Sequence, residues 1–291
     1  MEPRWSYLSW FPSKIRNFGT PRSFDLSIMR IGVVIEYDGT DLHGSQLQAT
    51  DRTVQGEIES VLPTIFGKQV RLYLASRTDA GVHGTGQVGA FNAETELNDQ
   101  KIRDAINHYL PEDVAIVCAS RVADDFDPRR NATSREYRYT IKDRPSRSPF
   151  SRFRTAHVRH RLDDSAMNEA ASHLNGEHDF ASFAGPATLS DAITTRRVEE
   201  SGVTRNGDEV EFNIRGNAFV HQQVRRMVGA LVRVGRAQMK GDQFQELIAR
   251  AERGLAKDLA PARGLCLTKV NYPGADETGL PRTTRDRATI R

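Results

Sequence analysis

The sequence predicts an α+β fold, in which strands and helices alternate and part of the sheet is antiparallel. In both halves of the chain, segments with apolar residues at every second position alternate with segments of helical spacing. An Asn206-Gly207 pair separates two strand-like segments, which is typical of a tight antiparallel hairpin. The 291 residues suffice for about two domains of roughly 150 residues each, so we expect two joined units.

The first half is predicted to contain two helices between strands. Strands are expected at residues 31–35, 70–74, 88–91 and 114–118. The first helix follows Thr53, a preferred N-cap residue, and ends at Gly67, with a kink expected at Pro63. The second helix follows Asn98. Its expected buried residues are Ile102, Ala105, Ile106 and Tyr109.

The second half continues the alternation and adds three helices. Strands are expected at residues 137–141, 210–214 and 265–272, with another before Asn206. One helix follows Asp163 and ends at Gly176, one starts near Ala218, and one follows Asp242. Their expected buried residues are Met167, Ala170, Ala171, Leu174, Val224, Met227, Val228, Leu231, Phe244, Leu247, Ile248 and Ala251.

These patterns place the two α+β halves at residues 29–131 and 132–272. Residues 1–28 have no usable period before an internal Met29, so we interpret them as a leader outside the fold. The leader is an unused upstream start, a disordered arm or, as a third alternative, an organelle transit peptide. Residues 273–291 are polar and mixed in charge, and we expect a disordered tail.

The cysteines, histidines and apolar runs of the sequence indicate which kinds of protein and of site to expect. Cys118 and Cys266 each lie in an apolar run without a metal-binding spacing, so we expect small buried hydrophobic residues. No segment has the roughly 18 apolar residues of a membrane span, and we expect a soluble cytoplasmic protein. His157 and His160 have an HxxH spacing but no third ligand, so no metal site is predicted.

Positive charge is concentrated in one stretch rather than in the whole chain. The totals of 41 Lys and Arg against 38 Asp and Glu are nearly balanced. Between Pro128 and Arg161, however, eleven residues are Lys or Arg and two are Asp or Glu. This stretch is either a phosphate-binding surface or a solvated charged face.

The segment SRTDAGVHG, residues 76–84, has the composition of a functional loop. It follows a predicted strand and combines a guanidinium, a hydroxyl, a carboxylate and two glycines. A carboxylate nucleophile must be ionised, and Arg77 or a basic residue from elsewhere would favour the charged form of Asp79. The alternative is that Asp79 only accepts hydrogen bonds from the backbone of a tight turn.

Five sequence blocks, in order, resemble the bacterial tRNA pseudouridine synthase A family. The first is EYDGTDLHGSQLQ and the second is SRTDAGVHGTGQVGAF. The others are SREYRYTI, NAFVHQQVRRMVG and GLCLTKVNYP. The resemblance extends from about Met29 to Pro273, and an ordered set of blocks is far more specific than one short motif.

The resemblance implies roles for individual residues. Asp79 corresponds to the family's nucleophile, Arg77 to a contact with the RNA, and Arg225 to the basic partner of the aspartate. Tyr137 is expected to stack on the target uracil, although it shares a strand face with Tyr139 and Ile141 and either tyrosine could be core. Further substrate contacts and phosphate contacts are expected from His83, Arg129, Arg130, Arg135, Arg152 and Arg154.

The resemblance also implies a pseudouridine synthase fold and a tRNA substrate. Two similar α+β halves would form a largely antiparallel mixed sheet flanked by helices, with the aspartate in the cleft between them. The chain would act as a homodimer on the anticodon arm of tRNA, isomerising uridines at positions 38 to 40. The reaction needs no cofactor.

Departures from the family pattern leave alternatives open. The family usually has an aromatic residue at Ser45, a glycine at Ser76 and an uninterrupted helix at Pro63. One alternative is a non-catalytic RNA-binding or RNA-folding protein that retains the fold. A second is an aspartate-dependent phosphotransferase or metal-dependent nuclease, which would need further carboxylates near Asp79.

Overall fold

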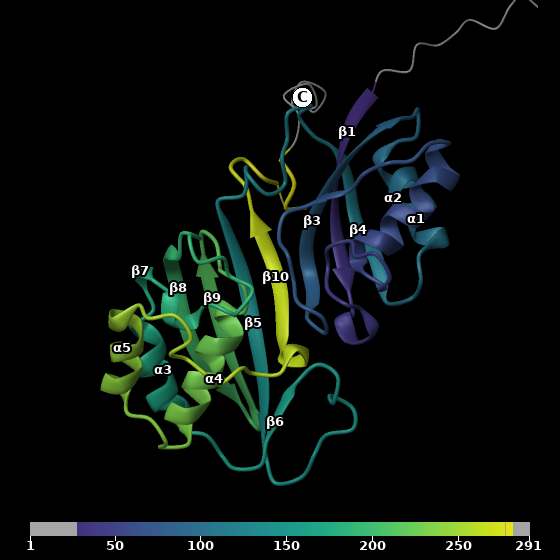
Figure 1. The fold of residues 1–291 in the computed structure, drawn as a ribbon. Helices are drawn as coiled ribbons and strands as arrows, with labels where there is room; N and C mark the ends of the chain where they lie inside the picture. The colour runs from purple at the N-terminus through teal and green to yellow at the C-terminus, as the bar shows by residue number, and fades with distance from the viewer. Residues whose placement is uncertain (1–27, 277, 282–291) are drawn as a thin grey trace, which may run out of the picture.

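A computed structural model describes residues 28–276 and 278–281 (Figure 1). The leader predicted for residues 1–28 lies outside the described residues except for Ile28, which begins the first strand. Residues 277 and 282–291 also lie outside the described part. Within it, every helix is too short or too polar to traverse a lipid bilayer.

One mixed sheet of ten strands runs through both halves of the molecule. Its order is β4-β1-β3-β10-β5-β9-β8-β7, with β2 beside β3 and β6 beside β5. The strands are β1 (Ile28–Tyr37), β2 (Tyr73–Leu74), β3 (His83–Glu94), β4 (Val114–Arg121), β5 (Ser134–Asp143), β6 (Ala156–Val158), β7 (Gly176–Asp179), β8 (Thr195–Asn206), β9 (Glu209–Gly216) and β10 (Leu265–Asn271). The pairs β3–β10 and β5–β6 are parallel and the other pairs are antiparallel. The predicted α+β class is confirmed.

Among residues 28–276 and 278–281, five α-helices flank this sheet. They are α1 (Val54–Phe66), α2 (Asp99–Tyr109), α3 (Asp164–Ser172), α4 (Gln223–Gly235) and α5 (Gly241–Arg250). In Figure 1, α1 and α2 lie beside the first strands, and α3, α4 and α5 gather beside β7, β8 and β9. The helices therefore belong to separate halves of one continuous sheet.

The predicted helix caps are largely confirmed. The side chains of Thr53, Asn98 and Asp163 each accept a hydrogen bond from a backbone N–H in the first turn of their helix. The N-cap of α5 is Lys240, and Asp242 lies in its first turn, so that assignment was wrong. Helix α4 begins at 223 rather than near 218, because Gln222 has a left-handed backbone with φ 61°.

Two hydrophobic clusters fill the molecule, one in the first half and one mainly in the second. Ile31, Val33, Ile58, Phe91 and Ile106 belong to the first cluster, which α1, α2 and the first strands enclose. Tyr109 was predicted to be buried but is 51% exposed, because the last turn of α2 faces solvent. Cys118 and Cys266 are only partly buried, which differs from the prediction.

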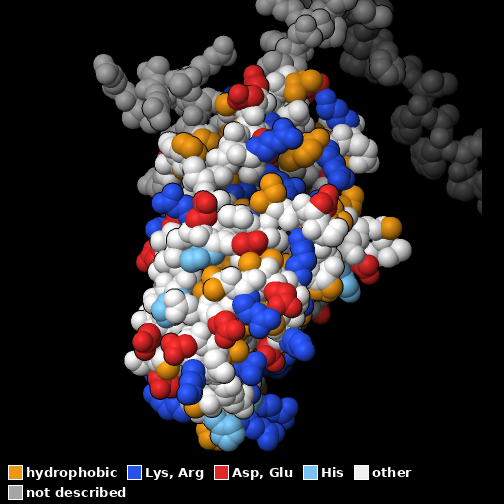
Figure 2. Space-filling model, turned by 60° about the vertical axis from the view of Figure 1, so that its left-hand side comes forward, with side chains coloured by type: hydrophobic (Ala, Val, Ile, Leu, Met, Phe, Trp, Pro, Cys, Tyr) orange, Lys and Arg blue, Asp and Glu red, His pale blue; other side chains and the backbone are white. Residues whose placement is uncertain are grey.

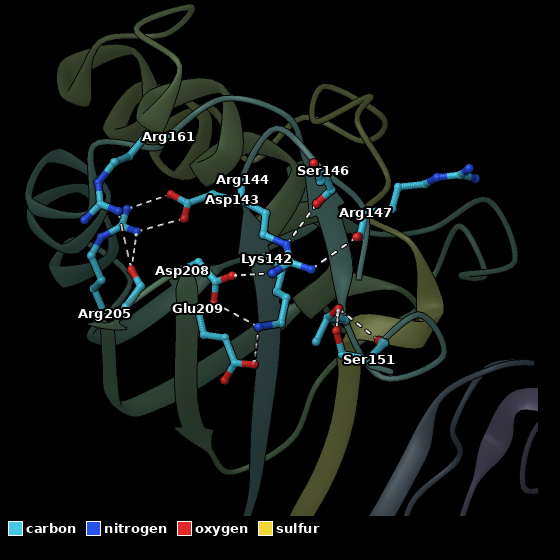
Figure 3. Close-up of polar contacts among 12 residues, drawn as sticks. Lys142, Asp143, Arg144, Ser146, Arg147, Ser151, Arg161, Arg205, Asp208 and Glu209 are labelled. Carbon is cyan, nitrogen blue, oxygen red and sulfur yellow. Dashed lines mark hydrogen bonds and ion pairs between the residues drawn. The ribbon is translucent and has the colours of Figure 1, made fainter. Parts of the chain in front are cut away.

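The hairpin predicted at Asn206-Gly207 joins β8 and β9. Asn206 pairs with Glu209, so the two connecting residues are Gly207 and Asp208, one position later than the dipeptide suggested. Gly207 has φ 61°, which a glycine adopts without steric cost. Arg205 at this end of β8 forms a two-pronged ion pair with Asp143 of β5, at 2.9 and 2.8 Å (Figure 3).

Two predicted segments differ from the structure. Of residues 70–74, only Tyr73–Leu74 form a strand. Leu280, in the predicted disordered tail, is fully buried in the second cluster, and Ala275 forms a β-bridge with Pro281. The chain therefore packs on the core beyond residue 272, as far as Pro281.

The parallel pairing of β3 with β10 joins the two halves. Cys266 and Leu267 of β10 lie opposite His83 and Gly84 at the start of β3. The loop that precedes β3 is therefore carried to the junction of the halves, where α4 and the start of β10 also lie.

Candidate active site

The loop between β2 and β3 lies beside the segment that leads into α4. Residues 75–82 leave the sheet after Leu74 and return to it at His83. Gly44, with φ 91°, lies against this loop, because a Cβ there would be 2.6 Å from the carbonyl oxygen of Thr78. This close approach positions Asp79, two residues before a left-handed Gly81.

Asp79 and Arg225 form an ion pair across the junction. Arg225 Nη1 lies 2.7 Å from Asp79 Oδ2, and the two side chains are 12% and 24% exposed. Arg225 Nε donates to the carbonyl oxygen of Ala260 at 2.9 Å, which fixes the guanidinium from its other side. A charge-assisted bond of this length holds one oxygen of the carboxylate in place.

His221 is a second group beside this carboxylate. Its Nε2 lies 3.6 Å from Asp79 Oδ1, the oxygen that Arg225 does not approach most closely. The sequence prediction gave this residue no role, although it stands four positions before Arg225 in the same block. The spacing of four residues from Arg225 was the signal that could have identified His221 as a neighbour of Asp79. His221 precedes α4, however, and is not part of the helix.

A cavity of about 510 Å³ contains this arrangement. Five arginines line it, and Asp79 is its one acidic residue among those described. The arginines are Arg77, Arg129, Arg135, Arg196 and Arg225. Figure 2 shows that acidic and basic side chains are interspersed on one outer face of the molecule. A cavity lined by arginines suits a polyanionic ligand.

Comparison with known proteins decides the family. The sequence profile described as tRNA pseudouridine synthase matches residues 33–129 and 170–273, which include Asp79 and Arg225. The chain belongs to the tRNA pseudouridine synthase family. This is a family of isomerases, and the fold is that of a pseudouridine synthase. Tyr137 lies between the two matched ranges.

Curated relatives agree with this assignment. The tRNA pseudouridine synthase A of Halalkalibacterium halodurans is 39% identical over 244 residues, which cover 83% of this chain and 92% of that protein. The tRNA pseudouridine synthase A of Azorhizobium caulinodans is 39% identical over 254 residues, which cover 87% and 98%. A chain of a solved Cbf5-Nop10-Gar1 complex is 12% identical, with a TM-score of 0.33 over 70% of this chain and 45% of that chain, too low to support a conclusion.

Tyr137 forms part of the cavity wall of this tRNA pseudouridine synthase. The residue lies on β5 and is 8% exposed, and its ring meets Phe219 edge to face at 5.3 Å between centroids. Burial raises the pKa of Tyr137 to about 12, against the opposing effect of a hydrogen bond with Ser76. The phenol is therefore neutral at physiological pH, and part of the side chain lines the cavity. Tyr139 is fully buried and donates to the carbonyl oxygen of Pro261, so it belongs to the core.

The predicted arginines differ in their surroundings. Arg77 and Arg129 are exposed and line the cavity. Arg135 also lines it but is buried, and its guanidinium donates to the carbonyl oxygens of Arg129, Asn217, Ala75 and Ala132. Burial lowers the pKa of Arg135 from its ordinary value. The hydrogen bonds show that this side chain organises the cavity wall, and it was predicted only as a substrate contact.

Several predicted contacts lie elsewhere. Arg130 does not line the cavity, and its guanidinium lies 3.9 Å from Asp127. Arg152 stacks over Phe153, and Arg154 lies 3.5 Å from Asp38, both outside the cavity. The basic stretch between Pro128 and Arg161 thus contributes Arg129, Arg135 and Tyr137 to the cavity wall.

His83, predicted to be a substrate contact, does not line this cavity. Its ring is buried, its Nδ1 accepts from the backbone N–H of Gly39 at 3.1 Å, and its Nε2 lies 2.9 Å from the carbonyl oxygen of Phe153. Through these contacts His83 links the backbone at Gly39 to the backbone at Phe153. The histidine therefore supports the start of β3 rather than reaching a substrate in the cavity.

Ser45, one of the two serines predicted to depart from the family pattern, supports the loop of Asp79 through its side chain. Ser45 is fully buried, and its Oγ accepts from the backbone N–H of Thr78 at 2.9 Å and donates to the carbonyl oxygen of Ser76 at 3.3 Å. Gln87 forms a further pair of hydrogen bonds with the backbone of Ser76. Ser45 thus supplies both a donor and an acceptor to the chain immediately before Asp79.

Proposed function

We propose that this enzyme isomerises uridine to pseudouridine at positions 38, 39 and 40 in the anticodon stem and loop of tRNA, with Asp79 as the nucleophile. The observation that carries the proposal is the ion pair of Asp79 with Arg225 inside a cavity lined by arginines. The names of the curated relatives support tRNA as the substrate. A homodimer and a cytoplasmic location stay predictions of the family resemblance.

The proposal gives each group a task in the reaction. Arg225 engages Asp79 Oδ2, and Oδ1, which has His221 Nε2 at 3.6 Å, would be the oxygen for the reacting nucleotide. The bond between N1 of uracil and C1′ of the ribose breaks, the base turns, and C5 bonds to C1′. The hydrogen of C5 is lost and N1 gains one, so the product is an isomer of the substrate.

The cavity also determines how the substrate must be presented. Asp79 is largely enclosed, so a uridine within a base-paired stem reaches it only when its base leaves the stack. The face of Tyr137 offers a stacking surface for that base, and Arg77, Arg129 and Arg196 offer positive charge for its phosphates. In this proposal the arginines that line the cavity bind the RNA phosphates, and Arg130, which does not line it, has no role.

The test uses unmodified tRNA and three proteins: the wild type, Asp79→Asn and Asp79→Ala. We expect pseudouridine at positions 38 to 40 with the wild type alone, and tRNA binding within about threefold in all three, since the substitutions remove one reacting group. Arg233→Ala, a change at a partly exposed residue of α4 that does not line the cavity, is the matched control and should retain activity. Formation of pseudouridine by Asp79→Ala would eliminate the assigned nucleophile.

The same experiment separates the alternatives. Binding by the wild type without isomerisation would favour an RNA-binding protein that retains the fold. Cleavage of the tRNA, stopped by a chelator, would favour a metal-dependent nuclease. Modification at other uridines would retain the reaction and reject the proposed sites.

A further inference from the structure

The loop 185–194 forms one wall of the cavity and exposes large apolar side chains. Leu189 is 71% exposed and lines the cavity, whereas Ile193 is 75% exposed and does not. A single exposed leucine is ordinary on a protein surface and by itself indicates nothing. The position of Leu189 at the cavity of Asp79 is what requires an explanation.

This loop is held in one conformation by polar contacts. Arg253 donates to the carbonyl oxygens of Thr188, Ser190 and Ala192, at 3.5, 3.2 and 3.2 Å. Hydrogen bonds from Thr188 to Gly185 and from Ala192 to Leu189 close two turns within it. Leu189 is therefore presented by a defined backbone rather than by an unconstrained chain.

The first residue of the loop connects it to the reacting groups. The backbone N–H of Gly185 donates to the carbonyl oxygen of His221 at 2.8 Å. A Cβ at this glycine would lie 2.5 Å from Nδ1 of His221, the residue whose Nε2 faces Asp79. The position of the loop is thereby tied to the position of the carboxylate.

The chemistry of the loop identifies the part of an RNA that it fits. Residues 185–194 contain no Lys or Arg, and their one charged residue is Asp191, so the loop has no cation for a phosphate. The arginines on the rest of the cavity wall supply that charge. An apolar side chain beside a cationic cavity fits a base face, which is the part of a nucleic acid that is neutral and stacks.

We propose that Leu189 is a wedge that enters the base stack of the RNA and fills the space left when the target uridine turns into the cavity. The inference rests on the proposed function, because it concerns the same cavity and the same class of substrate. Taking a base from a duplex costs the energy of unpairing and unstacking, and an inserted apolar side chain offsets part of that cost. Leu189 is thus a positioning residue, which acts on the RNA and not on the reacting bonds.

The proposal predicts a dependence on the pairing of the target. We would compare two anticodon stem-loops, one with the target uridine at 39 paired and one with it opposite an abasic site. Leu189→Ala should lower kcat/KM about tenfold or more on the paired target and less than about threefold on the unpaired one. Ile193→Ala, equally exposed on the same loop, is the matched control and should change neither, and Leu189→Met should restore most of the rate on the paired target.

A second measurement detects the movement of the base without the chemistry. In an Asp79→Asn background, a 2-aminopurine beside the target uridine should brighten when the protein binds, and Leu189→Ala added to this variant should abolish the increase. An equal increase with and without Leu189 would overturn the proposal, as would an equal loss of rate on both targets. An inactive wild type that still brightens the probe would reject the proposed function and retain the wedge.

Discussion

Arg225 and Asp79 are 146 positions apart in the chain and are joined by a contact of 2.7 Å. The aspartate comes from the loop before β3 in the first half, and the arginine comes from α4 in the second. Neither half therefore contains both members of this ion pair. The parallel pairing of β3 with β10 holds the two halves in the register that brings the two side chains together.

Substitution of Arg225 should remove activity without unfolding the protein. Arg225→Ala leaves a partly buried Asp79 without its guanidinium, and we expect kcat to fall by about 100-fold to 1000-fold. Arg225→Lys keeps the charge but loses the contact of Nε with Ala260, so partial recovery is expected. Single-turnover rates on tRNA would measure this, and unchanged rates for Arg225→Ala would contradict the role of the ion pair.

Ser45 should contribute to stability through the loop of Asp79. Ser45→Ala removes the acceptor for the N–H of Thr78 and the donor to Ser76, at a cost of about 1 to 3 kcal/mol in the free energy of unfolding. Urea unfolding would measure the loss, with the exposed Ser146→Ala as a control expected to change stability by less than about 0.5 kcal/mol. Equal unfolding free energies for Ser45→Ala and the wild type would exclude this support.

The ion pair of Arg205 with Asp143 should be essential to the second half (Figure 3). The side chain of Asp143 is fully buried, so Arg205→Ala leaves an uncompensated carboxylate and should cost about 3 to 5 kcal/mol of unfolding free energy. Adding Asp143→Ala should recover part of this loss, because the unpaired charge is gone. A double variant whose loss equals the sum of the two single losses would show that the groups do not interact.

Stability should fall at high pH in part through Tyr137. The folded protein raises the pKa of this phenol from about 10 to about 12, so its contribution is complete below pH 10 and is lost as the pH rises toward 12. Between pH 9 and pH 11 the effect of this one group amounts to roughly 1 kcal/mol. Tyr137→Phe keeps the ring but has no phenol to ionise. Between pH 9 and pH 11 its free energy of unfolding should therefore fall by less than that of the wild type, and the difference should be this amount.

The same variant separates stacking from ionisation in the reaction. Tyr137→Phe retains an aromatic face and should keep most of its activity on tRNA, whereas Tyr137→Leu should lose a larger part because a base stacks poorly on it. The ratio of the rate at pH 9 to the rate at pH 7 should be the same for the wild type and Tyr137→Phe, since the phenol is neutral at both pH values. A loss of activity by Tyr137→Phe alone would assign a role to the hydroxyl.

The correct predictions from sequence depend on local chemistry. The caps at Thr53, Asn98 and Asp163 were predictable because a side chain there bonds to a backbone N–H two or three positions away. The error at Asp242 has the same origin, since the side chain of Gln243 accepts from the backbone N–H of Lys240, which is the N-cap residue in its place. The prediction that Tyr109 is buried was wrong, because helical spacing identifies the apolar face of α2 but not how far along the helix that face contacts the core.

The candidate site shows the same limit. The density of polar residues and glycines in residues 76–84, a local property, made Asp79 a candidate, and the family resemblance gave it the predicted role of nucleophile. His83 and Arg130 belong to equally suggestive segments, yet both lie outside the cavity. The direction of a side chain at the end of a strand depends on pairing with distant strands, and no local pattern contains that pairing.

By itself, the sequence determined the α+β class, most helices and strands, the hairpin at Gly207 and the resemblance to a family, because periodicity, caps and turn residues act over a few positions. Only the tertiary structure decided that Arg225 meets Asp79, that His221 lies beside them and that Leu189 lines the same cavity. Those contacts join segments far apart in the chain. They form because the sheet pairs β3 with β10 and thereby positions every loop that the two halves share.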